Sequence, residues 1–388
     1  MTRRYADSAP PCETSPVTRT VGIEEEFLLV DDEGRPVARA SEALDASDRD
    51  DDGPARPSAT TGGGALEAEF MEEQLETATH PRRELSDLAT EIRAGRERAQ
   101  TAADRVGAQV AALATSPWPF EGTTVARLRY LEARAKFGLT AREQLTSGCH
   151  VHVAVADDAE GVAVLDRIGP WLSVLLALSA NSPFWQGEDS GFASYRSQVW
   201  ARWPTSGPAR AFGSPEAYHE AVENLVATGT ILDQDMVYFD ARLSSRYPTV
   251  EVRIADVCLD ADTATLLGAL ARGLVETAAR EAADGLPAPV LRTELLRTAA
   301  WRAGRSGLSD DLLSPLTWRP AGAHDVVGQL VAHVRDALVD ADDLSAVTDL
   351  LGRLWASGDG ATRQRAWHTA ADGDLRLVVE RAVAATHA

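Results

Sequence analysis

The sequence predicts an α+β fold, in which an antiparallel sheet over about 20–260 is followed by a helical region over about 261–388. In the first region, short β-branched segments such as 249–255 alternate apolar and polar residues, which is typical of strands. After Asp260, leucine and valine recur every three or four residues, which is typical of helices. No internal repeat is evident, so we expect a single domain over 20–388.

Strands and helices are expected in mixed order within the first region. Strands are predicted over 21–30, 106–114, 145–155, 236–240 and 249–255. Helices are predicted over 82–104, 124–143, 160–180 and 215–228. Residues 65–79 are expected to be structured as well, but their pattern does not decide between a helix and a strand.

Three segments lack a regular period. Residues 1–19 are polar and contain proline, which predicts a disordered tail. Residues 45–64 are rich in Asp, Pro, Gly and Thr, which predicts a surface loop. Residues 184–212 hold several tryptophans among Gly and Pro, and a long aromatic loop inside a compact domain is usually functional or disordered. Aromatic-rich surface segments of this kind also suggest a homodimer.

The strong negative charge argues against two classes of partner. The chain has 38 Lys and Arg residues against 59 Asp and Glu residues, a net charge of −21 at pH 7. This field repels the phosphate backbone of nucleic acids and anionic membrane surfaces, so neither is an expected partner. The longest apolar run, 171–180, is too short to span a bilayer, and no signal peptide is visible. We therefore expect a cytoplasmic protein.

Several common catalytic motifs are absent from the sequence. There is no Walker A loop, no dinucleotide fingerprint and no nucleophile elbow. The three cysteines, Cys12, Cys149 and Cys258, are far apart and odd in number, which indicates neither a disulfide framework nor a Cys-based zinc site. Candidate chemistry therefore rests on carboxylates, histidines and arginines.

An acidic triplet interrupts the first apolar strand. Side chains alternate between the two faces of a strand, so Glu24 and Glu26 share one face and Glu25 points to the other. The ordinary interpretation is a sheet edge with both carboxylates in water. Ile23 and Phe27 instead indicate a buried strand, where two like charges on one face need a cation. A hard divalent ion with oxygen ligands is the natural choice.

A second acidic cluster lies in the segment 65–79. Its carboxylates, threaded among apolar residues, are Glu67, Glu69, Glu72, Glu73 and Glu76. An amphipathic helix with a charged face is the common explanation, and it would place Glu69 and Glu76 on one face. A regular strand would place them on opposite faces unless a bulge intervened.

Two later strands carry polar pairs at a spacing of two residues. His150 and His152 share a strand face, and although a lone histidine is more often structural, two at this spacing favour a metal site. Glu251 and Arg253 share a face of the strand over 249–255. Their ordinary interpretation is a structural salt bridge. The functional interpretation is a metal carboxylate beside a guanidinium that binds phosphate.

Together the four segments resemble the carboxylate–amine ligase family within the glutamate–cysteine ligase type 2 group. The order and spacing of their motifs match that family from about residue 20 to 310. The resemblance implies a curved antiparallel sheet related to that of glutamine synthetase, with helices on its convex side and the active site on its concave side. The motifs are Gly22-Ile-Glu-Glu-Glu26, Glu69-Phe-Met-Glu-Glu-Gln-Leu-Glu76, Gly148-Cys-His-Val-His152 and Thr249-Val-Glu-Val-Arg-Ile-Ala-Asp256.

The resemblance also implies an activity and its site residues. ATP would phosphorylate a carboxylate, the γ-carboxylate of glutamate by analogy with the family, and an amine such as cysteine would attack the acyl phosphate. Glu251 and Arg253 would be catalytic, with Arg253 on the transferring phosphoryl group. Mg²⁺, or alternatively Mn²⁺, would be held by Glu24, Glu26, Glu69, Glu76, His150 and Glu251. Substrate-binding candidates are Arg129, Tyr195, Arg196 and Arg242.

Two rival functions belong to other classes. A zinc-dependent hydrolase would use His150 and His152 as a metal pair and would not need ATP. A non-catalytic relative would bind a nucleotide without turnover. The large number of carboxylates favours the ligase, because nucleotide binding alone does not require so many.

Overall fold

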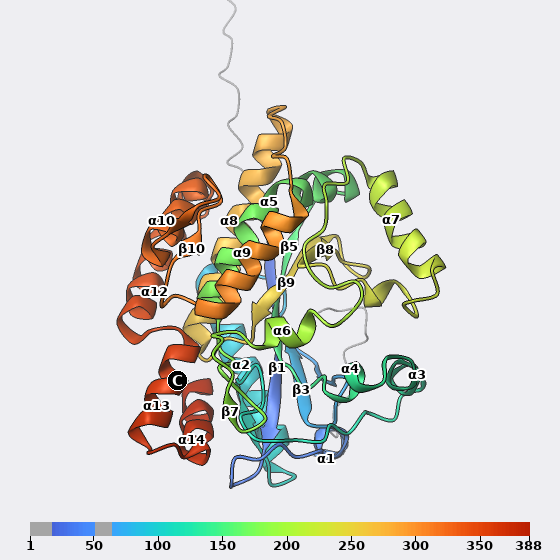
Figure 1. The fold of residues 1–388 in the computed structure, drawn as a ribbon, viewed down its shortest axis with the longest axis vertical. Helices are drawn as coiled ribbons and strands as arrows, with labels where there is room; N and C mark the ends of the chain where they lie inside the picture. Colours follow the sequence, from blue (N-terminus) through green and yellow to red (C-terminus); the bar gives the residue numbers. More distant parts are fainter. Residues whose placement is uncertain (1–17, 51–63) are drawn as a thin grey trace, which may run out of the picture.

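The computed structural model describes residues 18–50 and 64–388. Its centre is a seven-stranded sheet with the order β2-β3-β1-β5-β9-β8, to which β4 adds by pairing with β1 (Figure 1). Every pairing in this sheet is antiparallel, which confirms the expected α+β fold with an antiparallel sheet. Its strands are β1 (Val21–Val30), β2 (Leu66–Ala68), β3 (Gln74–Ala78), β4 (Gln109–Ala111), β5 (Gly148–Ala154), β8 (Ala241–Leu243) and β9 (Thr249–Asp256).

One face of the sheet is covered by long helices. Ile23 of β1, Val151 of β5 and Val252 of β9 lie in one buried cluster with leucines of α5 (Asp158–Ser179) and α8 (Ala261–Ala283). The helix α2 (Leu85–Asp104) adds Leu88 and Ile92 to the same cluster. Because side chains alternate along a strand, the residues between these apolar positions point to the opposite face, away from α2, α5 and α8. The polar residues predicted as functional occupy those alternate positions.

The remaining helices surround the sheet and extend the core toward the C-terminus. After β9 the chain is mainly helical (Figure 1). Of these helices, α9 packs against α5, α10 to α12 pack against α8, and α14 packs against β4 and α13. Two small hairpins, β6–β7 (Phe184–Trp185, Glu188–Asp189) and β10–β11 (Leu312–Leu313, Pro320–Ala321), lie outside the main sheet. The other helices are α1 (Ala40–Asp50), α3 (Leu128–Phe137), α4 (Leu139–Arg142), α6 (Arg196–Trp200), α7 (Pro215–Ala227), η1 (Gln234–Met236), α9 (Thr293–Ser306), α10 (Ala323–His333), α11 (Arg335–Asp340), α12 (Leu344–Ser357), α13 (Gly360–Ala370) and α14 (Leu375–Thr386).

A buried ion pair fastens β1 to the helices behind it. Arg96 of α2 donates to both carboxylate oxygens of Glu25, at 2.6 and 3.1 Å, and the two side chains are 1% and 2% exposed. The same guanidinium donates to the carbonyl oxygens of Cys258 (2.9 Å), Leu259 (3.4 Å) and Thr386 (3.0 Å). Glu25, the member of the acidic triplet that faces away from its neighbours, therefore holds the fold together.

Several expected elements differ from those observed. The segment 65–79 is neither one helix nor one strand but a hairpin of β2 and β3, with Met71–Gln74 at its turn. Residues 45–50, expected in a loop, complete α1, while residues 51–63 lie outside the described part of the chain. The strand predicted over 236–240 is replaced by η1 and by β8 further on, because Asp233 accepts from the N–H of Asp235 and starts a helical turn.

The predicted tail is described only at its end. Residues 1–17 lie outside the described part, but Arg19 is anchored by Glu160 (2.8 Å) and Glu276 (2.6 Å). These contacts tie the entry into β1 to α5 and α8.

The helix α5 is long and apolar enough to cross a membrane by length and composition. However, 83% of its most apolar window is buried inside the fold. Its leucines and valines pack against β5, β9 and α8. This burial identifies α5 as a core helix, although it is longer than the apolar run recognised in the sequence.

Candidate active site

The register of the sheet brings the predicted acidic residues together on the face opposite α2, α5 and α8. Directly opposed residues of antiparallel strands point to the same face. Glu76 of β3 lies opposite Glu67 of β2 on one side and opposite Glu26 of β1 on the other. Glu69, two positions after Glu67, points into the same cavity. The hairpin therefore achieves what a single regular strand could not, since Glu69 directly follows β2 while Glu76 lies on the antiparallel β3.

A second row of opposed residues continues across the sheet. Glu24 of β1 lies opposite His150 of β5, and His152 lies opposite Glu251 of β9. Glu251 in turn lies opposite Arg242 of β8. The four predicted segments thus contribute neighbouring strands, and their polar residues form one continuous surface.

This surface lines a cavity of about 550 Å³. Its walls are completed by α3, by the turn after α6 and by the loop on either side of β8. The predicted residues that line it are Glu24, Glu26, Glu69, Glu76, Arg129, His150, Arg242, Glu251 and Arg253.

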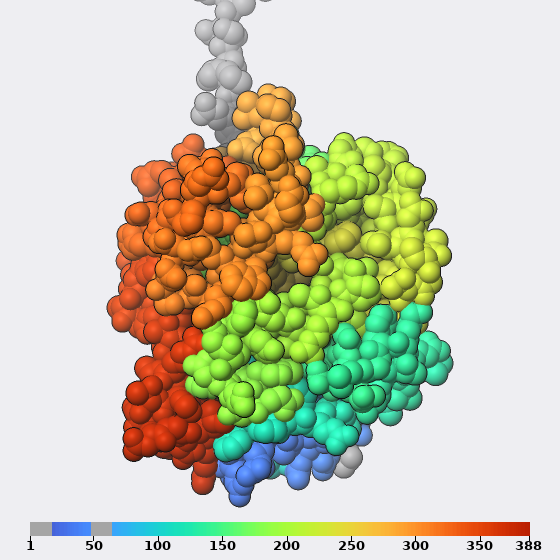
Figure 2. All heavy atoms as spheres, viewed as in Figure 1, coloured from blue at the N-terminus to red at the C-terminus, as the bar shows by residue number. Residues whose placement is uncertain are grey.

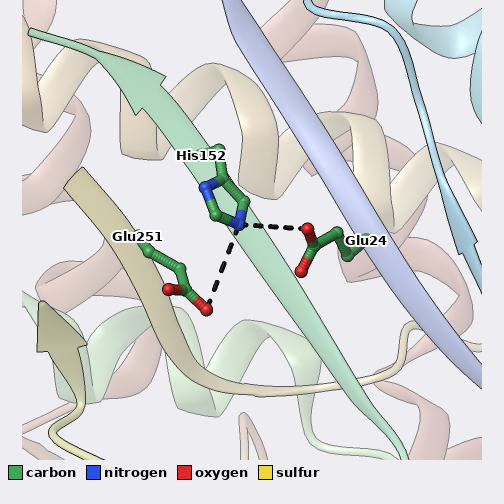
Figure 3. A group of neighbouring side chains, drawn as sticks. All are labelled: Glu24, His152 and Glu251. Carbon is green, nitrogen blue, oxygen red and sulfur yellow. Dashed lines mark ion pairs between the residues drawn. The ribbon is translucent and has the colours of Figure 1, made fainter. Parts of the chain in front are cut away.

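The two histidines are held by carboxylates of neighbouring strands. His152 Nε2 lies 3.4 Å from Glu24 and 4.0 Å from Glu251, as Figure 3 shows. His150 lies 3.5 Å from Glu24 through Nδ1 and 3.9 Å from Glu26 through Nε2. Glu24 therefore stands between two imidazoles. Glu26 accepts the N–H of Gly148 at 2.6 Å, which fixes its carboxylate at the start of β5.

Glu24 and Glu251 are the carboxylates with compensating cations. Burial alone would raise the pKa of Glu24, but the neighbouring imidazoles of His152 and His150 lower that pKa well below its usual range. Burial likewise opposes ionisation of Glu251, yet Arg253 and Arg242 hold its pKa below its usual range. Arg242 donates to Glu251 at 2.8 Å, and Arg253 is also ion-paired with it. Both carboxylates are therefore anionic at neutral pH.

Glu69 and Glu76 lack such compensation. Burial and the neighbouring charge of Glu26 raise the pKa of Glu69 to about 7. Burial and the charges of Glu24 and Glu69 raise the pKa of Glu76 well above its usual range. Because these carboxyl groups ionise readily only beside a cation, the cluster is suited to binding a cation.

Two groups of side chains have the geometry of metal ligands. One group is Glu24, His152 and Glu251, and the other is Glu24, Glu76 and His150; within each, the ligand atoms lie within 4.8 Å of one another. Nε2 of His150 and Nε2 of His152 are buried without a hydrogen-bond partner among the described residues. Carboxylates and unpartnered imidazole nitrogens facing one cavity fit divalent ions. His150 and His152 belong to different groups, so the histidine pair expected for a zinc hydrolase is divided between two sites.

The predicted substrate-binding residues are not all in this cavity. Arg129 lines it but is held by Asp233 through two hydrogen bonds, at 2.6 and 2.8 Å, and Arg242 is committed to Glu251. Tyr195 does not line the cavity, because it lies against the rings of Trp185 and Phe192. Arg196 lies behind it and lines a second cavity, since α6 turns its buried side chain toward β9.

Some residues of this cavity were not predicted to have a role from the sequence. His152 was given no role in the ligase reaction, although its spacing from His150 already placed it on the same face. Arg127 and Arg246 also line the cavity and are exposed, so their guanidinium groups are available to a ligand. No pattern in the sequence marks them, since each lies in an irregular segment.

The family follows from comparison with known sequences. Residues 20–381 match the sequence model of Glutamate-cysteine ligase family 2 (GCS2). The chain is 52% identical over 351 residues to "Putative glutamate–cysteine ligase 2-1" of Streptomyces avermitilis, covering 89% of this chain and 94% of that one. It is 50% identical over 371 residues to "Putative glutamate–cysteine ligase 2" of Streptomyces coelicolor, covering 95% and 99%. The chain belongs to glutamate–cysteine ligase family 2.

Solved structures share the fold at low sequence identity. A glutamate–cysteine ligase from Francisella tularensis, in complex with AMP, superposes with a TM-score of 0.68 at 12% identity, covering 96% of this chain and 90% of that one. A bifunctional glutathione synthetase from Pasteurella multocida gives a TM-score of 0.66 at 16% identity, covering 94% of this chain and 52% of that one. Together with the family membership, these structures confirm the expected fold class and the enzyme class, an ATP-dependent ligase.

Proposed function

We propose that this ligase joins the γ-carboxylate of glutamate to an amine such as cysteine through an acyl phosphate, with Mg²⁺ in the acidic cavity. The observation that carries the proposal is the convergence of Glu24, Glu26, Glu69, Glu76 and Glu251 with two histidines beside Arg253. The names of the relatives support the choice of glutamate and cysteine. All of these partners are small molecules.

The acidic cluster can bind the phosphates of ATP only if cations lie between the carboxylates and the phosphates. Free carboxylates would repel a triphosphate, whereas divalent ions would be attracted to both. Glu24, Glu76 and His150 would hold one ion, and Glu24, His152 and Glu251 another. Bound there, Mg²⁺, or Mn²⁺ given the histidine ligands, would neutralise charge on the phosphates.

Arg253 is placed to act on the transferring phosphoryl group. It is 8% exposed, lines the cavity, and its Nε is buried without a partner among the described residues. Its ion pair with Glu251 and the Arg242–Glu251 contact hold the guanidinium beside the acidic row. A fixed cation at this point would stabilise the charge that develops as a substrate carboxylate oxygen bonds to the γ-phosphorus and ADP leaves.

Amide formation completes the reaction. The amine nitrogen would attack the carbonyl carbon of the acyl phosphate, inorganic phosphate would leave, and the nitrogen would lose its proton. Water must be kept from the acyl phosphate, which it would otherwise hydrolyse. Trp200, Trp203 and Tyr238 contribute apolar surface to the wall of the cavity.

The test is release of ADP from Mg-ATP, with glutamate fixed and the amine varied. Glu251→Gln keeps the shape but removes the charge that orients Arg242 and Arg253, so turnover is expected to fall by at least ~100-fold. Glu33→Gln, an exposed change beyond the end of β1, is the matched control and should retain activity. Absence of turnover with every amine, in wild-type protein that binds ATP, would instead support a non-catalytic nucleotide-binding relative.

A further inference from the structure

A second cavity lies behind the acidic one. Its volume is about 630 Å³, and it opens between α9 and the segment that follows α6. Figure 2 shows the surface hollowed at this place, between the orange α9 and the light-green chain around α6. Its charged and aromatic lining residues are Arg196, Trp200, Arg202, Trp203, Phe239, Asp240, Arg253, Arg297 and Trp301.

The two cavities share a wall. Arg253, Trp200 and Trp203 line both of them. Gly148 stands at the same boundary, because a Cβ at this position would overlap the guanidinium of Arg196 and would lie 3.2 Å from Nε2 of His150. A molecule in the second cavity would therefore approach Arg253 from the side opposite the acidic row.

The second cavity contains cations without adequate partners. Arg196 is 2% exposed, yet it makes only long hydrogen bonds, 3.4 Å to the carbonyl of Ile254 and 3.5 Å to that of Arg253. Its Nε has no partner among the described residues, and it lies 4.0 Å from Asp256, whose oxygens already accept from Ser182 and Ser194. Arg297 is exposed at the mouth, and within the described residues it forms no ion pair.

One carboxylate stands among these cations. The side chain of Asp240 takes part in no hydrogen bond or ion pair between described residues, although its main chain is held by Gly207 and Arg253. Burial raises the pKa of Asp240 to about 7, against the opposing charges of Arg196 and Arg297. A simple anion would be repelled by Asp240 and a simple cation by the arginines. A ligand with both charges would satisfy all of them.

We propose that the second cavity binds the amine acceptor as an α-amino acid zwitterion, with Asp240 facing its ammonium group and Arg196 and Arg297 facing its carboxylate. This inference rests on the proposed ligase reaction and specifies how its second substrate enters. The acceptor nitrogen would reach the acyl phosphate past Arg253, while the phosphates of ATP remain on the acidic side. Trp301 and Phe239 supply apolar surface for the acceptor side chain.

The experiment compares acceptors that differ only in their carboxylate. L-cysteine and cysteamine, and L-2-aminobutyrate and propylamine, form two such pairs. Arg297→Gln should raise the KM of each amino acid by at least ~10-fold and leave that of its decarboxylated partner nearly unchanged. Asp240→Asn should raise the KM of both members of a pair by a similar factor. The KM values for ATP and glutamate should not change in either variant.

The matched control is Arg305→Gln. It removes the same charge from the same helix, but Arg305 lies against Phe192 and lines neither cavity. Unchanged acceptor KM values in Asp240→Asn and Arg297→Gln, in enzyme that still turns over, would overturn the inference while leaving the proposed reaction intact.

A binding measurement covers the case in which wild-type enzyme shows no turnover. Calorimetric titration of proteinogenic L-amino acids other than glutamate into the enzyme, with Mg²⁺, glutamate and a non-hydrolysable ATP analogue present, identifies the amino acid that binds most tightly as acceptor. Loss of that binding in Asp240→Asn would support the second cavity even if the proposed reaction failed. Failure of every amino acid to bind, or equal binding to the variant, would overturn it.

Discussion

The two faces of β1 place neighbouring carboxylates in opposite electrostatic environments. On the helical face, Glu25 is matched by Arg96, and further hydrogen bonds to carbonyl groups satisfy the guanidinium. On the open face, Glu26 lies opposite Glu76 and close to Glu69, and these carboxylates outnumber the nearby cations. A buried charge with a complete set of partners serves the fold, whereas a buried charge without them is available for a ligand.

The largest expected effect is on stability, when the ion pair between Arg96 and Glu25 is broken. Arg96→Met leaves Glu25 buried without a cation, so the free energy of unfolding should fall by about 3–5 kcal/mol. The double variant Arg96→Met/Glu25→Met should recover most of the loss, because no unpaired charge remains. Urea denaturation measures both.

The control for this prediction is Arg93→Met on the same helix. Arg93 forms an exposed pair with Asp262, which should contribute less than about 1 kcal/mol. If Arg96→Met cost no more than Arg93→Met, Glu25 would not be a structural carboxylate and the contrast between the faces would disappear.

A smaller change in the free energy of unfolding, of opposite sign, is expected for the carboxylates on the cavity face of the sheet. In the presence of EDTA, Glu76→Gln should raise the free energy of unfolding at neutral pH, since it removes a carboxyl group whose ionisation is disfavoured by burial and by the neighbouring carboxylates. Added Mg²⁺ should stabilise the wild type but have little effect on this variant. Glu67→Gln, in the same row but exposed, is the control and should change neither quantity much. Equal stabilisation of Glu76→Gln and wild type by Mg²⁺ would remove Glu76 from the ion site.

The smallest effect is a pH dependence. The folded protein binds the proton of Glu69 more tightly than the unfolded chain, because burial raises its pKa from 4.5 to about 7. The stability that this proton contributes is fully present below pH 4.5 and is lost as the pH rises through about 7. In EDTA, the decline of unfolding free energy over this window should be shallower in Glu69→Gln than in wild type. Identical slopes would show that Glu69 is not held protonated.

Local alternation was sufficient to predict which of the candidate residues share a face of the sheet. A spacing of two residues within a strand placed Glu24 with Glu26 and Glu251 with Arg253, and the structure brings both pairs to one cavity. Glu25 was correctly separated from its neighbours by the same rule, but its partner Arg96 is 71 positions away and carries no distinguishing pattern. The general fold class and its helical C-terminal region followed from periodicity alone.

Features that depend on long-range register could not be predicted. The turn at Met71–Gln74 lacks Gly, Pro and Asn, so the hairpin that joins Glu69 to Glu76 gave no signal. The pairing of His152 with Glu251 is set by how β5 and β9 align, including the bulge between Cys149 and Val151. The direction of Arg196 and Tyr195 is decided by the packing of an aperiodic segment.

The contacts of Arg96 also bear on the order in which parts of the chain can fold. Arg96 is bonded to the carbonyl of Thr386, 290 positions later in the sequence. Because a chain is synthesised from its N-terminus, this bond can form only after α14 has been made. Until then the guanidinium behind β1 lacks its final acceptor and α14 has not reached β4. The strand β1, although it is made long before α14, is thus secured by its full set of contacts only after α14 has folded against it.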